Sequence, residues 1–75
     1  MNRLIRINQD EWINVNSIDA ISIKEYETRV DTFTTNPKEI TKYYVVFTVN
    51  KYMFDSQNFN TYEEVINWLE SELVL

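Results

Sequence analysis

The ten residues ITKYYVVFTV (40–49) decide the fold of this chain, because they form its longest run with the composition of a β-strand. Side chains alternate across a strand, so Val45 and Phe47 lie on one face while Tyr44 and Val46 lie on the other. Both faces are apolar, although a single helix covers only one face of a sheet. We therefore expect the sheet to curl over its second face; the alternative is that this face meets a partner.

Shorter strands are predicted on both sides of this run. They cover Leu4–Ile7, Trp12–Val15, Ile21–Thr28, Arg29–Thr35 and Tyr52–Phe54. Asn36-Pro37 is a strong turn signal, and Asn50-Lys51 predicts a two-residue turn because asparagine tolerates a positive φ. Strands therefore occupy about residues 3–54.

The C-terminal part predicts one helix from Tyr62 to about Leu73. Thr61 and Glu64 have the spacing of a capping box, in which the threonine caps the helix and the glutamate reaches back to the N–H of Thr61. Apolar residues at helical spacing form the stripe that we expect to face the sheet. This stripe consists of Tyr62, Val65, Ile66, Leu69 and Leu73.

The order of these elements predicts one domain over residues 1–75 of the α+β class. We expect an antiparallel, curled four- to five-stranded sheet, a partial barrel, with one C-terminal helix. A chain of 75 residues buries a thin core, but its 44% apolar content is enough to fold without disulfide or metal support.

The net charge of the chain lies at its C-terminal end. The formal net charge is −5, residues 1–54 are neutral, and residues 55–75 contain no lysine or arginine. The acidic residues there are Asp55, Glu63, Glu64, Glu70 and Glu72. Long-range attraction would steer this acidic helix toward a basic partner, for which a nucleic-acid-binding host protein is the natural candidate.

The composition excludes several chemistries. The chain has no cysteine, histidine or glycine, so disulfides, the usual general base and phosphate-cradling glycine loops are all absent. Residues 55–60 have the alternating oxygen side chains of a calcium loop but lack its glycine, and Ile66 stands where the loop needs a glutamate. We therefore expect no enzyme, no metal site and no cofactor.

Composition also bears on location and source. No stretch approaches the roughly 20 apolar residues of a membrane span, and the N-terminal apolar run is too short for a signal peptide. We expect a cytoplasmic protein that makes no membrane contact. Residue types with AT-rich codons dominate the sequence, which indicates a low-GC bacterium or one of its phages or plasmids.

The two tryptophans have different expected roles. Trp68 lies beside the apolar helix stripe, so we expect it to close the core against the sheet. Trp12 follows a charged loop, and an exposed tryptophan there would be a rigid anchor for a partner.

Two other classes of function compete with binding a host protein. The first is a structural or regulatory homo-oligomer assembled through Tyr44, Val46 and the tail Leu73–Leu75. The second is nucleic-acid binding, which the acidic composition disfavours, by a lysine–tyrosine cluster at one end of the long hairpin. Its members would be Lys38, Lys42, Lys51, Tyr43, Tyr44 and Tyr52.

Two segments, WINVNSIDAI (12–21) and EEVINWL (63–69), together resemble a known family. A W-I-N followed by isoleucines three apart, then a strand, then E-E-x-x-x-W-L, resembles small bacterial and phage proteins of the FlbD flagellar-operon type. The resemblance implies a small β-sheet with one helix and a binding or regulatory role, and it transfers no functional residue. Residues 26–43 are longer here than in that family pattern.

The sequence therefore predicts a small non-enzymatic protein-binding module, such as a phage or mobile-element inhibitor that occludes a host protein through an acidic helix. The predicted contact residues are Asp55, Glu63, Glu64, Glu70, Trp12, Tyr44 and Val46.

Overall fold

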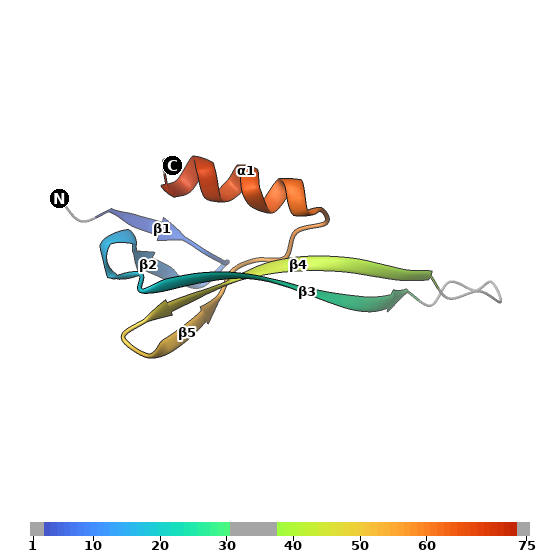
Figure 1. Cartoon of the computed structure of the whole chain (residues 1–75), viewed down its shortest axis with the longest axis horizontal. Helices are drawn as coiled ribbons and strands as arrows, with labels where there is room; N and C mark the ends of the chain where they lie inside the picture. Colours follow the sequence, from blue (N-terminus) through green and yellow to red (C-terminus); the bar gives the residue numbers. More distant parts are fainter. Residues whose placement is uncertain (1–2, 31–37, 74–75) are drawn as a thin grey trace.

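A computed structural model, which describes residues 3–30 and 38–73, shows an α+β fold with one C-terminal helix (Figure 1). The elements in chain order are β1 (Leu4–Arg6), β2 (Trp12–Asn14), the short 3-10 turn η1 (Val15–Ser17), β3 (Ala20–Val30), β4 (Lys38–Val49), β5 (Tyr52–Asp55) and α1 (Tyr62–Leu73). The fold class and the position of the helix were therefore predicted correctly.

The strands form two separate sheets, and the prediction of one curled sheet of four to five strands is wrong. β1 and β2 make a two-stranded antiparallel sheet, and β3, β4 and β5 make a three-stranded one in the order β3-β4-β5. Within the described ranges no closed barrel forms. The chain changes direction at η1, where the Asn14 side chain accepts a hydrogen bond from the N–H of Asn16 at 2.9 Å, so β2 does not continue into the larger sheet.

A long antiparallel hairpin of β3 and β4 dominates the larger sheet. Its register runs unbroken from the pair Ala20 and Thr48 to the pair Val30 and Lys38. β3 includes Arg29 and Val30, so these residues do not begin a separate strand as predicted. The rest of that predicted strand and the predicted turn at Asn36-Pro37 lie outside the described residues.

The return from β4 to β5 follows the prediction. Asn50 and Lys51 both have positive φ, 50° and 72°. Two consecutive residues of this kind make a turn whose twist matches that of the flanking strands, which is why a two-residue loop can connect them.

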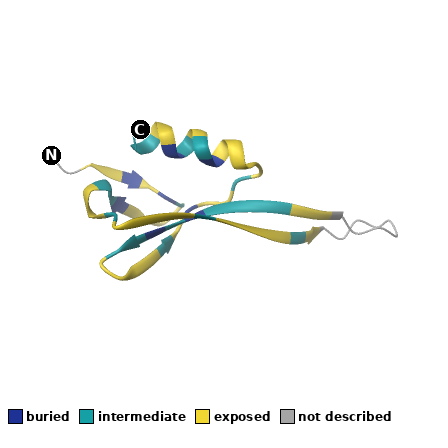
Figure 2. Ribbon diagram, viewed as in Figure 1, coloured by how far each residue is buried: buried dark blue, intermediate teal, exposed yellow. Residues whose placement is uncertain are grey.

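The core lies where α1, the β1–β2 sheet and one face of the larger sheet meet (Figure 2). Its buried residues are Ile5, Ile7, Ile13, Val45, Phe47, Val65 and Leu69. Trp68 packs against this cluster, with its ring centroid 6.0 Å from that of Phe47 and 5.3 Å from that of Phe59. The prediction that Trp68 closes the core is confirmed.

The start of α1 is fixed by two hydrogen bonds. The hydroxyl of Thr61 accepts from the N–H of Glu64 at 3.1 Å, as the capping box predicts. The carboxylate of Glu64 accepts from the N–H of Asn60 at 3.2 Å, one residue earlier than predicted. Tyr62, predicted to be buried in the helix stripe, is 53% exposed and meets the edge of Tyr43 at 6.2 Å.

One buried hydroxyl ties the connection after β5 to the sheet. The Oγ of Ser56 accepts from the N–H of Val45 and donates to the carbonyl of Gln57, both at 2.8 Å. The N–H and carbonyl of Phe59 then bond the carbonyl and N–H of Tyr43 at 2.7 and 2.9 Å. The chain therefore runs beside β4 before it enters α1.

Candidate protein-binding surfaces

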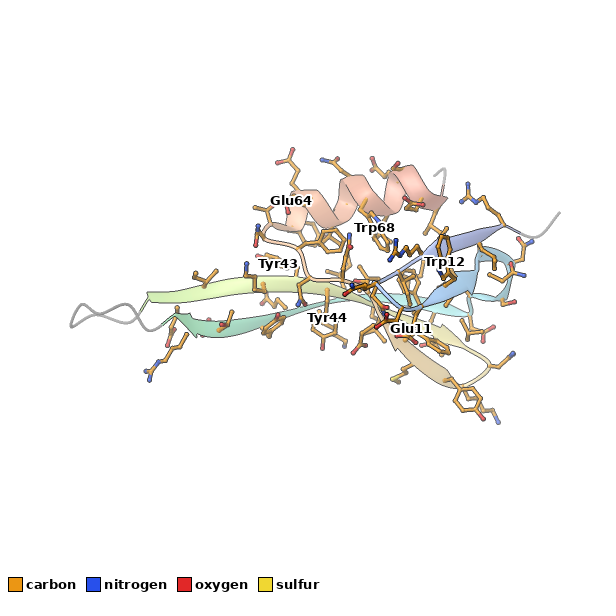
Figure 3. All side chains as sticks on the ribbon, turned by 180° about the vertical axis from the view of Figure 1, so that it is seen from behind. Glu11, Trp12, Tyr43, Tyr44, Glu64 and Trp68 are labelled. Carbon is orange, nitrogen blue, oxygen red and sulfur yellow. The ribbon has the colours of Figure 1, made fainter. Side chains whose placement is uncertain are left out.

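The two faces of the larger sheet are in different environments. Val45 and Phe47, which face α1 and the β1–β2 sheet, are both 0% exposed. Tyr44 and Val46 alternate with these residues along β4 and are partly exposed on the opposite face. In Figure 3 Tyr43 lies between β4 and α1 while Tyr44 lies on the far side of the sheet. Among the described residues, those that pack against the core cluster do not include Tyr44, Val46 or any other residue of that far side.

We call this second surface the uncovered face. The register of the strands places on it Ser22, Lys24, Tyr26 and Thr28 from β3, Lys42, Tyr44, Val46 and Thr48 from β4, and Met53 and Asp55 from β5. Met53 is 75% exposed and Tyr26 is 38% exposed, which agrees with a surface open to solvent.

The uncovered face brings together three of the predicted contact residues. Tyr44 and Val46 alternate along β4, and Asp55 pairs directly with Val46. Tyr26, which the sequence analysis did not select, meets Tyr44 edge to face at a centroid distance of 5.8 Å. Only the pairing of β3 with β4 shows that Tyr26 lies next to Tyr44, because the two residues are 18 positions apart in the sequence and belong to different strands.

The acidic residues do not form one surface. Glu63, Glu64 and Glu70 are exposed on α1, which packs on the covered side of the sheet (Figure 3). Asp55 pairs with Val46 on the uncovered face, so it lies apart from the helix glutamates. Asp55 was predicted to act together with the helix glutamates because they are close in sequence, and the sheet register separates them.

Trp12 belongs to a third region, on β2. It is 60% exposed, and the guanidinium of Arg6 lies 5.8 Å from its ring centroid. Arg6 also donates to the carbonyls of Asn8 and Gln9 at 3.2 and 2.8 Å. A cation over the ring contributes roughly 0.5–1 kcal/mol at an exposed site, so this contact favours the observed position of the Trp12 side chain.

The predicted lysine–tyrosine cluster is not assembled. Lys42 lies near the start of β4 and Lys51 in the turn after it, a separation of about 30 Å along an extended strand. Tyr43 and Tyr44 point to opposite faces, and the Nζ of Lys42 donates to the side chain of Asn60. Lys38 pairs with Val30 in the register, and its side chain lies outside the described part of the structure.

Comparison of the chain with protein-family models, with curated proteins and with solved structures gives no match. Within residues 3–30 and 38–73, no three histidine, cysteine, aspartate or glutamate side chains are placed to hold a metal ion. No helix in the same residues has the length and apolar character needed to cross a bilayer. The surfaces of the molecule are therefore the basis for any functional proposal.

Proposed function

We propose that this chain is a small non-enzymatic module that binds a partner protein through the uncovered face. The observation that supports this is the contrast between Val45 and Phe47, which are 0% exposed, and Tyr44 and Val46, which are part of an open face. Antiparallel sheets that face water on one side usually carry polar residues there. This face carries a tyrosine pair and a valine, and tyrosine is a preferred residue at protein interfaces.

The helix glutamates have a separate part in this proposal. Glu63, Glu64 and Glu70 are exposed on the other side of the molecule, and the chain carries a net charge of −5. Charge attraction falls off over about 8–10 Å in physiological salt, so these glutamates act on a basic partner that approaches or borders the α1 side of the molecule, and not across the sheet. A host nucleic-acid-binding protein, occluded in the cytoplasm of a low-GC bacterium by a phage or plasmid factor, fits this combination of charge and surface.

A homo-oligomer remains the second candidate, because the same uncovered face is available to another copy of the chain. The tail predicted to take part in such an assembly includes Val74 and Leu75, which lie outside the described residues. Sedimentation over a range of micromolar concentrations separates the two candidates. A monomer at every concentration supports the binding module.

The test is a pull-down from a low-GC bacterial lysate, eluted with increasing salt, using three forms of the chain. The Tyr26→Ala, Tyr44→Ala double variant removes the tyrosine pair of the uncovered face. Tyr52→Ala is the matched control. Tyr52 is 71% exposed in the same sheet, and its pairing with Val49 places it on the face opposite to Tyr44. We expect the double variant to lose a partner that the wild type and the control retain. Equal retention by all three forms would contradict the proposal.

A further inference from the structure

The outer side of β3 is an unusually long open sheet edge. The order β3-β4-β5 puts β3 at the border of its sheet, and β3 has 11 residues. Its register with β4 contains no skipped residue, so no bulge interrupts it, and it contains no proline. Sheet edges are commonly protected by shortness, bulges, proline or charged side chains, and β3 has only the last of these, at Lys24, Glu25, Glu27 and Arg29. Among the described strands, none pairs with this side of β3.

The hydrogen bonds of β4 show which backbone groups of that strand face away from β3. The N–H and carbonyl of Tyr43 bond Phe59, and the carbonyl of Val45 accepts from the N–H of Ser56 at 2.8 Å. Backbone groups of successive residues alternate in direction along a strand. The backbone N–H and carbonyl groups of the odd-numbered residues of β4 therefore point toward β5 and the chain that follows it, and those of the even-numbered residues point toward β3.

The same alternation assigns the groups of β3. Lys24 and Tyr26 are opposite even-numbered residues of β4, so their N–H and carbonyl groups bond that strand. Ile23, Glu25 and Glu27 therefore direct their N–H and carbonyl groups to the open side. These three residues present a row of donors and acceptors for one more strand.

The side chains beside this row favour one kind of strand. Glu25 and Glu27 are exposed and lie on the α1 side of the sheet. In an added strand, the residues directly opposite them would place their side chains on the same face, next to the two glutamates. Two open hollows of about 410 and 310 Å³ follow the hairpin here, and Glu25 and Tyr43 line both. Ile23 and Tyr62 contribute apolar surface to the lining of the smaller hollow. The methylene chains of lysine or arginine side chains could pack on this surface.

We propose that the outer edge of β3 accepts an extended basic segment of the partner protein as an additional antiparallel strand. This inference rests on the proposed protein-binding function and names the part of the partner that is recognised. Lysine or arginine opposite Glu25 and Glu27 forms cross-strand charge pairs, while the backbone of the segment bonds the open row. A second copy of this chain is a poorer occupant, because each copy carries a net charge of −5.

The test uses a synthetic peptide in which lysine and valine alternate. With the lysines opposite Glu25 and Glu27, the lysine amides face β3 and the valine amides face solvent. Three peptides are compared by isothermal titration: the parent, one N-methylated on its lysine amides, and one N-methylated on its valine amides. We expect N-methylation of the lysines to weaken binding by about tenfold or more, and N-methylation of the valines to change it by less than about threefold. Equal affinity of the two N-methylated peptides would overturn the proposal.

Amide exchange gives an independent readout on the protein. In the free protein the N–H groups of Ile23, Glu25 and Glu27 should exchange quickly, while those of Lys24 and Tyr26 are protected by β4. The parent peptide should slow exchange at the first three positions. Binding without slower exchange at these positions would mean that the peptide attaches elsewhere.

Charge reversal locates the site. Glu25→Lys with Glu27→Lys is compared with Asp10→Lys with Glu11→Lys, which changes the net charge equally at exposed positions of the loop between β1 and β2. We expect about a tenfold loss of peptide affinity in the first variant and less than about threefold in the second. Equal losses would show attraction to overall charge and overturn strand addition. If the wild-type chain does not bind the peptide but still captures a partner whose binding depends on Tyr44, this inference is refuted and the proposed function stands.

Discussion

Val45 and Val46 provide a direct test of whether the second sheet face is open, because they are adjacent and point to opposite sides. Val45 is 0% exposed in the core, whereas Val46 is partly exposed on the uncovered face. Valine→threonine replaces one methyl group by a hydroxyl of similar size and keeps the strand preference. Val45→Thr and Val46→Thr therefore make the same chemical change in two environments.

The expected magnitudes differ clearly. At Val45 the hydroxyl is removed from water inside an apolar cluster, which costs about 1–3 kcal/mol in mutational data. At Val46 the hydroxyl reaches solvent, and the change should stay within about 0.5 kcal/mol. A domain of this length has a total stability of roughly 4–11 kcal/mol, so the first loss is a large fraction of it. At about 4–8 °C per kcal/mol, Val45→Thr should lower Tm by roughly 4–24 °C, while Val46→Thr should lower it by less than about 4 °C.

Urea and thermal unfolding measured by circular dichroism give both values. Fluorescence supplies a second probe in a Trp12→Phe background, because Trp68 packs against Phe47 and Phe59 in the folded state. Comparable destabilisation by the two threonine variants would refute the reasoning, since it would mean that Val46 is buried in solution. A loss at Val46 that grows with protein concentration would identify a second copy of the chain as the cover.

Three further outcomes follow from local geometry. Lys51 has a φ of 72°, so Lys51→Gly should raise the free energy of unfolding by about 0.5–1 kcal/mol in urea titrations, and no gain would mean that the turn adopts another form. Ser56→Ala leaves the buried N–H of Val45 without its acceptor and should cost about 1–3 kcal/mol, in contrast to Ser71→Ala at an exposed helix position. Thr61→Ala removes the helix cap and should cost about 1 kcal/mol, measured by thermal unfolding, with Thr61→Ser retaining most of it.

The parts of the fold that could be predicted depend on local interactions. The helix bounds Tyr62–Leu73 follow from a cap at Thr61 and apolar residues at helical spacing, which are fixed within a few turns of chain. The turn at Asn50 and Lys51 follows from the tolerance of asparagine for positive φ. These signals need no knowledge of distant residues.

The division into two sheets and the composition of the surfaces depend on pairing across long stretches of chain. The sequence suggests apolar character on both faces of β4, but it does not say which strand borders it or where the N-terminal strands go. Pairing places Tyr26 beside Tyr44 and moves Asp55 away from the helix glutamates. The open edge of β3 could not be predicted either, because an edge exists only where a strand has no neighbour on one side, and the sequence does not show which strands are neighbours.

The two proposed surfaces meet along β3, and this restricts what a partner strand must look like. Glu25 and Glu27 lie on the α1 side of the sheet, whereas Lys24 and Tyr26 lie on the uncovered face. A strand added to the edge would therefore extend both faces at once, with basic residues on one side. On its other side, an acidic or aromatic residue would suit the positions opposite Lys24 and Tyr26. Uniformly basic segments satisfy only the first side, so alternation of charge and apolar character, rather than total positive charge, should decide which segments bind.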